Sequence, residues 1–303
     1  MGQGYIAQRL NLQPLLRLAP VAGLPSLAAH CFAGMALSGA ALQLQVLPLV
    51  LGVAAMHLGV NWLGVAYRTG LPAPQLPGRA AEQNSTTQPA TLLKVGYGAL
   101  TLGGLLCCSA TLWSYGGTLQ RHGLATALSV ACLAVANLFA TLRASNSNTA
   151  RLVAGLNRAV VYLIAALTAG GGRELPLWLA LVSTWVYVSG STYALHLAST
   201  APWVTRWPLT SLALPAAGLL LWAEPNQTTW AALAVYALWQ AYALVALLVP
   251  KHYHPQRAES RLMAGLALAD GLWTFQAGAT DLTLLCACAF VGTCLIPHLL
   301  KDP

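Results

Sequence analysis

Residues 44–67 read LQVLPLVLGVAAMHLGVNWLGVAY, a run of 24 residues without a charged side chain. About 20 such residues are enough for a helix to cross the hydrocarbon core of a bilayer. The run ends at Arg68, and its second half carries His57 and Asn61. The stretch therefore predicts a membrane-spanning helix, and it places two polar side chains at membrane depth.

The whole chain has the same apolar character. It is 57% hydrophobic and only 7% charged, with a mean hydropathy of +0.63, whereas soluble proteins carry about 25% charged residues. This composition excludes a soluble enzyme, a nucleic-acid-binding protein and a disordered chain, although the formal net charge is +8. We expect a multi-pass integral membrane protein with no nucleic-acid partner.

Apolar runs of helix length recur along the sequence and predict an all-α membrane bundle of about nine to ten transmembrane helices. We expect one integral membrane domain over 1–303, with a first helical half over 1–170 and a second over 171–303. The only long connection is the proline-rich loop 68–90, which is expected on the inner side. The ten predicted helices are 22–41, 44–67, 91–113, 121–143, 152–170, 175–199, 204–222, 228–249, 260–277 and 281–299.

The basic residues fall mainly on one side of this predicted bundle. With the amino terminus placed inside, thirteen Lys and Arg residues lie on the inner side, and only Arg121 and Arg173 lie on the outer side. Lys and Arg concentrate in cytoplasmic loops of membrane proteins. The pattern predicts a bacterial inner-membrane protein with both termini in the cytoplasm.

Polar side chains at membrane depth are the candidates for function. His57, Asn61 and Arg68 recur at helical spacing, so they share one face of the helix over 44–67. This stripe is either the wall of a ligand cavity or an interhelical hydrogen-bonded seam. Tyr187 and Ser191 form a comparable face on the helix over 175–199, where small neighbours favour packing first and a cavity second.

Asn157 and Arg158 lie near the inner end of the helix over 152–170, close to several other basic and amide side chains. Together with Arg68 they could hold a phosphate or diphosphate directly, because the guanidinium fork matches phosphate oxygens without a metal. The alternative is a set of charges that only fixes topology and faces lipid head groups.

Buried titratable groups are few. Asp270 is the only acid well inside a predicted helix, and we expect it to be neutral and hydrogen-bonded rather than a proton carrier, because no second intramembrane acid is available as a relay. His30, His57 and His196 could pair as ligands of a haem or chlorophyll. Hydrogen bonds between helices are the more common role for such histidines.

Five short motifs are spread over nearly the whole chain: LLRLAP at 15–20, Asn61, PGR at 77–79, YVSGST at 187–192 and the Leu-to-Asp segment at 266–270. In these motifs the chain resembles the UbiA-type intramembrane prenyltransferases, and among them the EboC-like branch. The resemblance implies a helical membrane fold, usually of nine helices. It also implies prenyl transfer to an aromatic or lipid acceptor, with aspartates that hold Mg²⁺ on a prenyl diphosphate.

The aspartates of that family are missing here. In the motif N-D-x-x-D-x-x-x-D only Asn61 is kept, while Trp62, Val65 and Thr69 occupy the acidic positions, and no Asp or Glu occurs between Glu174 and Glu224. A Mg²⁺ site needs oxygen ligands, usually carboxylates. We therefore expect no metal site and no cofactor, although Mg²⁺ belongs to the family.

These observations lead to two functional hypotheses. The first is a UbiA-like homologue that binds or handles an isoprenoid or other lipid in an intramembrane cavity, with prenyl transfer disfavoured by the missing aspartates. Its substrate-binding residues would be His57, Asn61, Arg68, Asn157, Arg158, Tyr187 and Ser191. The alternative is a non-catalytic structural or transport subunit with a protein partner in a membrane complex. The residues alone do not decide whether the chain is an enzyme.

Overall fold

The computed structural model describes residues 21–70, 89–114, 121–142, 148–197, 203–248 and 255–299. These residues contain ten α-helices, two 3₁₀ segments and no strand, so the predicted all-α class is confirmed. The elements are η1 (Val21–Gly23), α2 (Leu24–Leu37), α3 (Val46–Gly70), α5 (Pro89–Ser114), α6 (Arg121–Leu142), α7 (Asn148–Thr168), α8 (Leu175–Leu197), η2 (Trp203–Ala213), α9 (Leu214–Trp222), α10 (Gln227–Leu248), α11 (Pro255–Gln276) and α12 (Thr280–Leu299).

Four predicted helices differ clearly from the structure. Those over 152–170 and 260–277 begin earlier, at Asn148 and Pro255, and the other two differ for identifiable reasons. The predicted helix over 22–41 ends already at Leu37, because Gly39 adopts a φ of +77° that an α-helix cannot continue. The predicted helix over 204–222 consists of η2 followed by α9, with Pro208 inside the 3₁₀ part. Proline supplies no N–H for the regular α-helical ladder at that point. The predicted loop 68–90 lies mostly outside the described residues.

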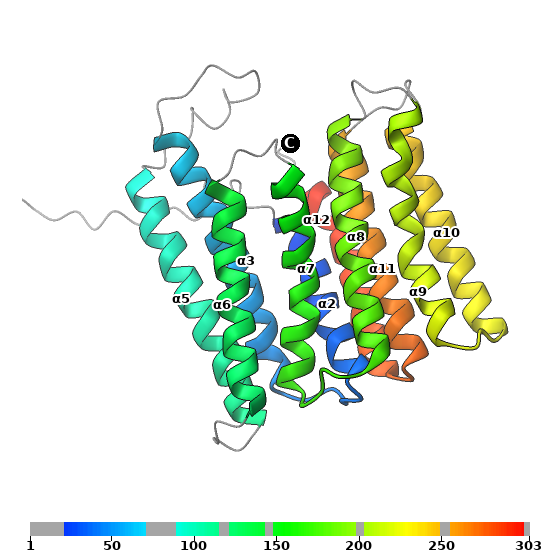
Figure 1. The fold of residues 1–303 in the computed structure, drawn as a ribbon, viewed down its shortest axis with the longest axis horizontal. Coiled ribbons are helices and arrows are strands. Elements are labelled where there is room, and N and C mark those ends of the chain that lie inside the picture. Colours follow the sequence, from blue (N-terminus) through cyan, green and yellow to red (C-terminus); the bar gives the residue numbers. More distant parts are fainter. Residues whose placement is uncertain are drawn as a thin grey trace, which may run out of the picture.

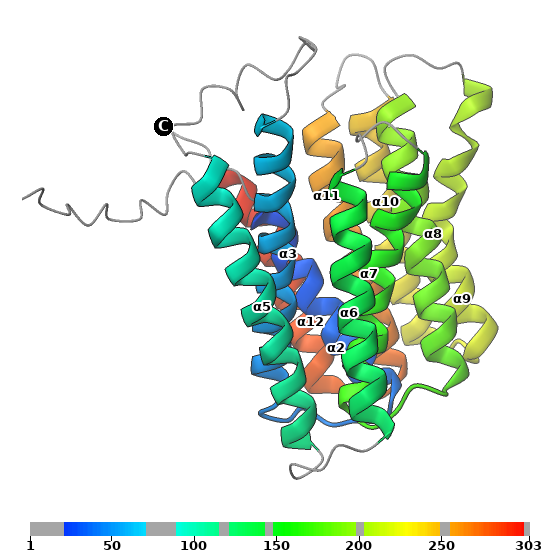
Figure 2. The same ribbon diagram turned by 60° about the vertical axis from the view of Figure 1, so that its left-hand side comes forward.

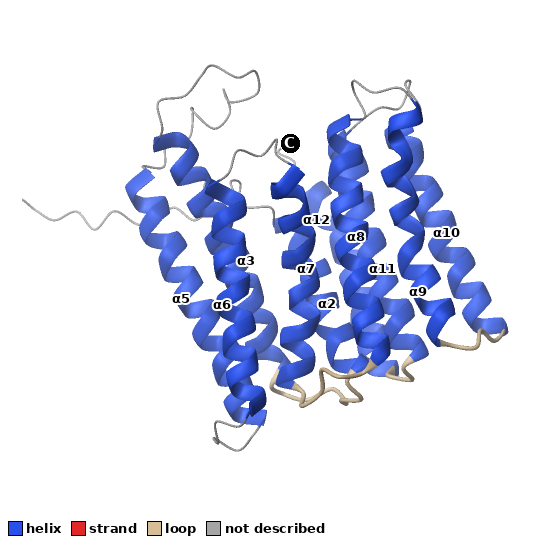
Figure 3. Cartoon of the chain, viewed as in Figure 1, coloured by secondary structure: helices blue, strands red, loops and turns tan. Residues whose placement is uncertain are grey.

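The helices alternate in direction across the bundle. The connections 38–45, 169–174, 223–226 and 277–279 all lie along its lower edge (Figure 3). Successive helices therefore run in opposite directions, with η2 and α9 together forming one passage (Figure 1). Such an up-and-down order is what the predicted sequence of membrane crossings requires.

Four described helical segments are long and apolar enough to span a membrane: Val46–Tyr67, Ala90–Trp113, Arg151–Thr168 and Gln227–Leu248. Shorter apolar segments occur at Leu24–Leu37, Gly123–Val135, Pro208–Trp222 and Thr280–Ile296. Many large apolar side chains are exposed, among them Leu105, Leu221 and Leu238 at 69%, 78% and 71%. An exposed apolar surface of this kind is suited to lipid, and the chain is a membrane-embedded helical protein.

Helix α2 lies in the middle of the bundle and packs against α7, α11, α12 and α3, as the second view shows (Figure 2). Its residues from Ser26 to Leu37 are buried except Ala28. A helix that is surrounded on all sides has no solvated face, so its polar side chains must find partners within the protein. Ser26 and His30 are the polar side chains in question.

Candidate functional site

A buried polar centre is formed where α2 meets α7. The Arg158 guanidinium on α7 donates through Nη1 to Ser26 Oγ at 2.8 Å and to the Gly23 carbonyl at 3.4 Å. Ser26 Oγ in turn donates to the Gly23 carbonyl at 2.9 Å. Only 9% of Arg158 is exposed, so this cation is held inside the bundle at the beginning of α2.

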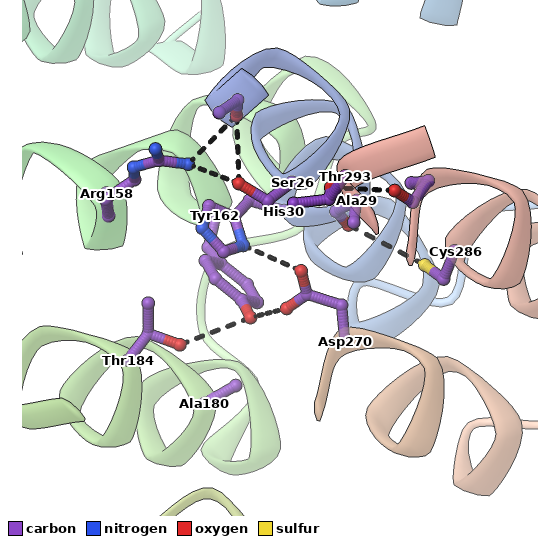
Figure 4. Close-up of polar contacts among 12 residues, drawn as sticks. Ser26, Ala29, His30, Arg158, Tyr162, Ala180, Thr184, Asp270, Cys286 and Thr293 are labelled. Atoms are coloured by element: carbon purple, nitrogen blue, oxygen red, sulfur yellow. Dashed lines mark hydrogen bonds and ion pairs between the residues drawn. The ribbon is translucent and has the colours of Figure 1, made fainter. Parts of the chain in front are cut away.

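One helical turn further along both helices lies a second group of polar side chains (Figure 4). His30 Nδ1 is 2.7 Å from Asp270 Oδ2 on α11. The Tyr162 hydroxyl donates to Asp270 Oδ1, and Thr184 Oγ1 on α8 lies 3.2 Å from the Tyr162 hydroxyl. The His30 ring stacks on the Tyr162 ring, with 5.1 Å between centroids. This hydrogen-bond chain joins α2, α7, α8 and α11.

The register of α2 against α7 explains why these residues meet. Ser26 and His30 are four residues apart on α2, and Arg158 and Tyr162 are four residues apart on α7, so each pair lies on one helix face. The next contact is at Gly34, where an added Cβ would lie 2.5 Å from the Tyr162 carbonyl. Glycine therefore lets α2 and α7 approach closely enough for the two polar pairs to form.

Part of the predicted polar stripe on α3 forms a hydrogen bond within α3 itself. Asn61 Nδ2 donates to the His57 carbonyl at 2.7 Å, which is a bond within α3 rather than between helices. His57 Nε2 is buried and has no hydrogen-bond partner among the described residues. The His57 imidazole and the Arg158 guanidinium interact electrostatically. Arg68 belongs to the last turn of α3, but its side chain lies outside what is described.

The two predicted residues on α8 occupy a different part of the bundle. The Tyr187 hydroxyl donates to the Leu262 carbonyl at 2.9 Å and is 3.2 Å from Gln240 Oε1, so it joins α8 to α10 and α11. Ser191 Oγ donates to the Val188 carbonyl of its own helix at 3.0 Å. Both polar groups therefore have protein partners. Asn157 precedes Arg158 on α7, is partly buried and also interacts with other groups.

Charge in the centre is distributed unevenly. His30 Nδ1 and Asp270 Oδ2 lie at ion-pair distance, 2.7 Å apart. Arg158 has no carboxylate at ion-pair distance in the described part of the bundle, although Asp270 and Glu259 attract it from further away. Asp270 is hydrogen-bonded, as the sequence predicts. Among the described residues, the hydrogen-bond partners of the Arg158 guanidinium are thus the neutral Ser26 hydroxyl and Gly23 carbonyl.

Two of the three positions where the UbiA-type motif has aspartates carry apolar side chains here. Trp62 and Val65 are buried with Ala66 and Leu92 in a hydrophobic cluster between α3 and α5. Among the described residues, no three His, Cys, Asp or Glu side chains come together as a metal site would require.

Sequence reasoning singled out Arg158, His30 and Asp270, but it did not pair them with one another. It missed Ser26, Tyr162 and Thr184, because these residue types are common in membrane helices. The spacing of Arg158 and Tyr162 is the signal that could have indicated the shared face. In comparisons with known protein families, with curated proteins and with solved structures, the chain has no match.

Proposed function

We propose that the chain is a UbiA-like multi-pass membrane protein that binds an isoprenoid or related lipid at the polar centre between α2 and α7, without metal-dependent prenyl transfer. The observation that carries this proposal is Arg158, a buried cation with no carboxylate in ion-pair contact in the described part of the chain. An anionic lipid head group would supply the missing charge.

The energetic argument rests on desolvation. Moving an ion from water into a protein interior carries a penalty of several kcal/mol even after relaxation, and neutral hydrogen bonds offset only part of it. The guanidinium has five N–H donors, and the two bonds to Ser26 and Gly23 both use Nη1. A phosphate oxygen pair fits the remaining fork and neutralises the charge.

His57 supports the same position. Its Nε2 atom is buried and without a partner among the described residues, and the ring is within electrostatic range of Arg158. A neutral imidazole N–H can donate to a phosphate oxygen. A head group that extends from Arg158 toward His57 would also pair this nitrogen, which has no partner among the described residues.

We propose that metal-dependent prenyl transfer is absent, because other residues stand where the UbiA-type family has aspartates. Trp62 and Val65 have no side-chain oxygen with which to hold Mg²⁺, and both pack in an apolar cluster. Without bound metal, neutralisation of a departing diphosphate would fall to Arg and Lys alone. Binding or transfer of an intact lipid between membrane sites fits this arrangement better than bond cleavage.

The orientation in the membrane belongs to this proposal. Lys94, Arg151, Arg257 and Arg261 lie in the opening turns of α5, α7 and α11, which begin at the edge opposite the described connections. That edge is proposed to face the bacterial cytoplasm, with both termini on the same side. Lipids with phosphorylated head groups would then enter the centre from the cytoplasmic leaflet.

Replacement of Arg158 by Gln tests the proposal. The variant should retain roughly tenfold less farnesyl phosphate than the wild-type protein, since one charge-assisted contact is lost. Retention of ubiquinone, which has no charge, should be unchanged. Both lipids would be measured by mass spectrometry after incubation with the full chain in detergent and removal of free lipid.

Arg151→Gln is the matched control, because Arg151 lies on the same helix and at the same exposure but stacks over the Tyr193 ring at 5.3 Å. It should leave farnesyl phosphate retention intact. Equal losses of both lipids in Arg158→Gln, or equal losses of farnesyl phosphate in both variants, would contradict a phosphate site at Arg158.

A structural or transport subunit is the second candidate. The hydrogen-bond chain through His30, Asp270, Tyr162 and Thr184 favours it, because a chain that joins four helices also rigidifies a scaffold. A stoichiometric partner protein in a mild purification, without bound isoprenoid, would be the outcome expected of this alternative.

A further inference from the structure

His30 has one nitrogen held tightly and one left without a partner. The side chain is fully buried at 0% exposure, and its Nδ1 atom contacts Asp270 at 2.7 Å. The other nitrogen, Nε2, has no hydrogen-bond partner among the described residues. Stacking on Tyr162 fixes the plane of the ring, so the direction of Nε2 is fixed as well.

The partners of Asp270 indicate which nitrogen of His30 carries the proton. Tyr162 donates to Oδ1, while Thr184 donates to the Tyr162 hydroxyl and so directs the tyrosine proton toward the carboxyl group. The Arg158 cation attracts Asp270 from beyond ion-pair distance. These contacts favour a carboxylate at Asp270, in place of the neutral acid expected from sequence, with the His30 proton on Nδ1.

It follows that Nε2 presents a lone pair. A buried acceptor without a donor is destabilising, and in the described part of the bundle no side chain satisfies it. We propose that His30 Nε2 accepts a hydrogen bond from a hydroxyl group of the bound isoprenoid lipid. The polar centre then selects head groups that carry O–H, one helical turn from the guanidinium of Arg158.

This inference rests on the proposed lipid-binding function, and the probes are chosen to separate the two. Farnesol, farnesyl methyl ether and farnesal share one tail, but only farnesol has an O–H donor. The wild-type full chain in detergent should bind farnesol roughly fivefold to tenfold more tightly than either of the others, which corresponds to one net hydrogen bond. Binding would be followed through displacement of a fluorescent isoprenoid.

Asp270→Asn reverses the expected preference. Because Tyr162 still donates to the amide oxygen, the amide N–H₂ must face His30 and donate to Nδ1. The His30 proton then moves to Nε2, which becomes a donor. Farnesol should lose its advantage over farnesyl methyl ether, and farnesal should gain affinity.

Thr293→Val is the control, because the Thr293 hydroxyl donates to the Ala289 carbonyl of its own helix at 2.8 Å, and the preference for farnesol should persist. Nitrogen-15 NMR of labelled histidine gives a readout that does not depend on binding, with the Nδ1–H form of His30 expected in the wild-type protein and the Nε2–H form in Asp270→Asn. Equal affinities for the three probes, or an Nε2–H form in the wild-type protein, would overturn this inference. Binding of farnesyl phosphate without binding of any of the three probes would also overturn it, whereas failure of all four lipids to bind would overturn the proposed lipid-binding function.

Discussion

Arg158 illustrates how one buried charge shapes its surroundings. Ser26 Oγ and the Gly23 carbonyl both accept from its Nη1 atom, and an added Cβ at Gly23 would lie 2.9 Å from Nη2. The small residue at 23 thus leaves room for the guanidinium at the start of α2. Residues with no charge of their own determine where this cation can lie.

Individual residues of the centre were only partly predictable. Asp270 and His30 are conspicuous in sequence because a charged or titratable side chain in an apolar run is expensive. Their contact joins residues 240 positions apart, and helical periodicity carries no information on which distant helices pack together. Asn61 shows a second reason why prediction fails. Its four-residue spacing from His57 fits a shared helix face, but it equally permits the hydrogen bond within α3 that the structure contains.

At the scale of the element, most helices could be predicted because bilayer thickness fixes the length of an apolar run. The exceptions occur where local backbone chemistry intervenes, as at Gly39 after α2 and at Pro208 within η2. The close pairing of α3 with α5 was not predicted. It depends on glycines at matching depths, and their matching becomes visible only once the two helices are placed side by side (Figure 2).

Glycines at the α3–α5 contact provide a prediction about this pair. An added Cβ at Gly103 would lie 2.5 Å from the Gly52 carbonyl oxygen and 2.8 Å from the Met56 backbone nitrogen. Gly103→Ala should therefore force the helices apart and destabilise the protein by about 1–3 kcal/mol. The midpoint of thermal unfolding in detergent, followed by size-exclusion chromatography, measures the loss.

Gly98→Ala is the matched control on the same helix, because an added Cβ there meets nothing within 4 Å. It should be neutral or stabilising by up to about 1 kcal/mol through helix propensity. Similar destabilisation by both substitutions would show that α3 and α5 are not held by backbone contact at Gly103.

For the whole molecule, the two edges of the bundle differ in charge. Glu174 and Glu224 lie in the described connections at the lower edge, together with Arg173, and Asp281 lies in the first turn of α12 at that edge. The basic turns of α5, α7 and α11 begin at the opposite edge, where Glu259 is the one acid among the described residues. Basic residues are retained on the cytoplasmic side, so this separation supports the proposed orientation.

Reporter fusions give the topology directly. Fusions at residues 80, 147 and 254 should report a cytoplasmic location, and fusions at 117 and 226 should report the opposite side, because each pair of successive positions is separated by an odd number of predicted crossings. The activities of an alkaline phosphatase and a fluorescent protein reporter would be compared at every position. A cytoplasmic signal at 226 would contradict ten alternating spans.

The central claim is that this membrane bundle holds an isoprenoid lipid at its polar centre. Native mass spectrometry of the full chain, released from detergent without added lipid, tests it most directly. We predict an adduct of one lipid per chain, identified as an isoprenoid by fragmentation, that is depleted in Arg158→Gln but retained in Arg151→Gln. A wild-type chain that carries no isoprenoid and instead remains bound to a partner protein in equal amount would contradict the claim.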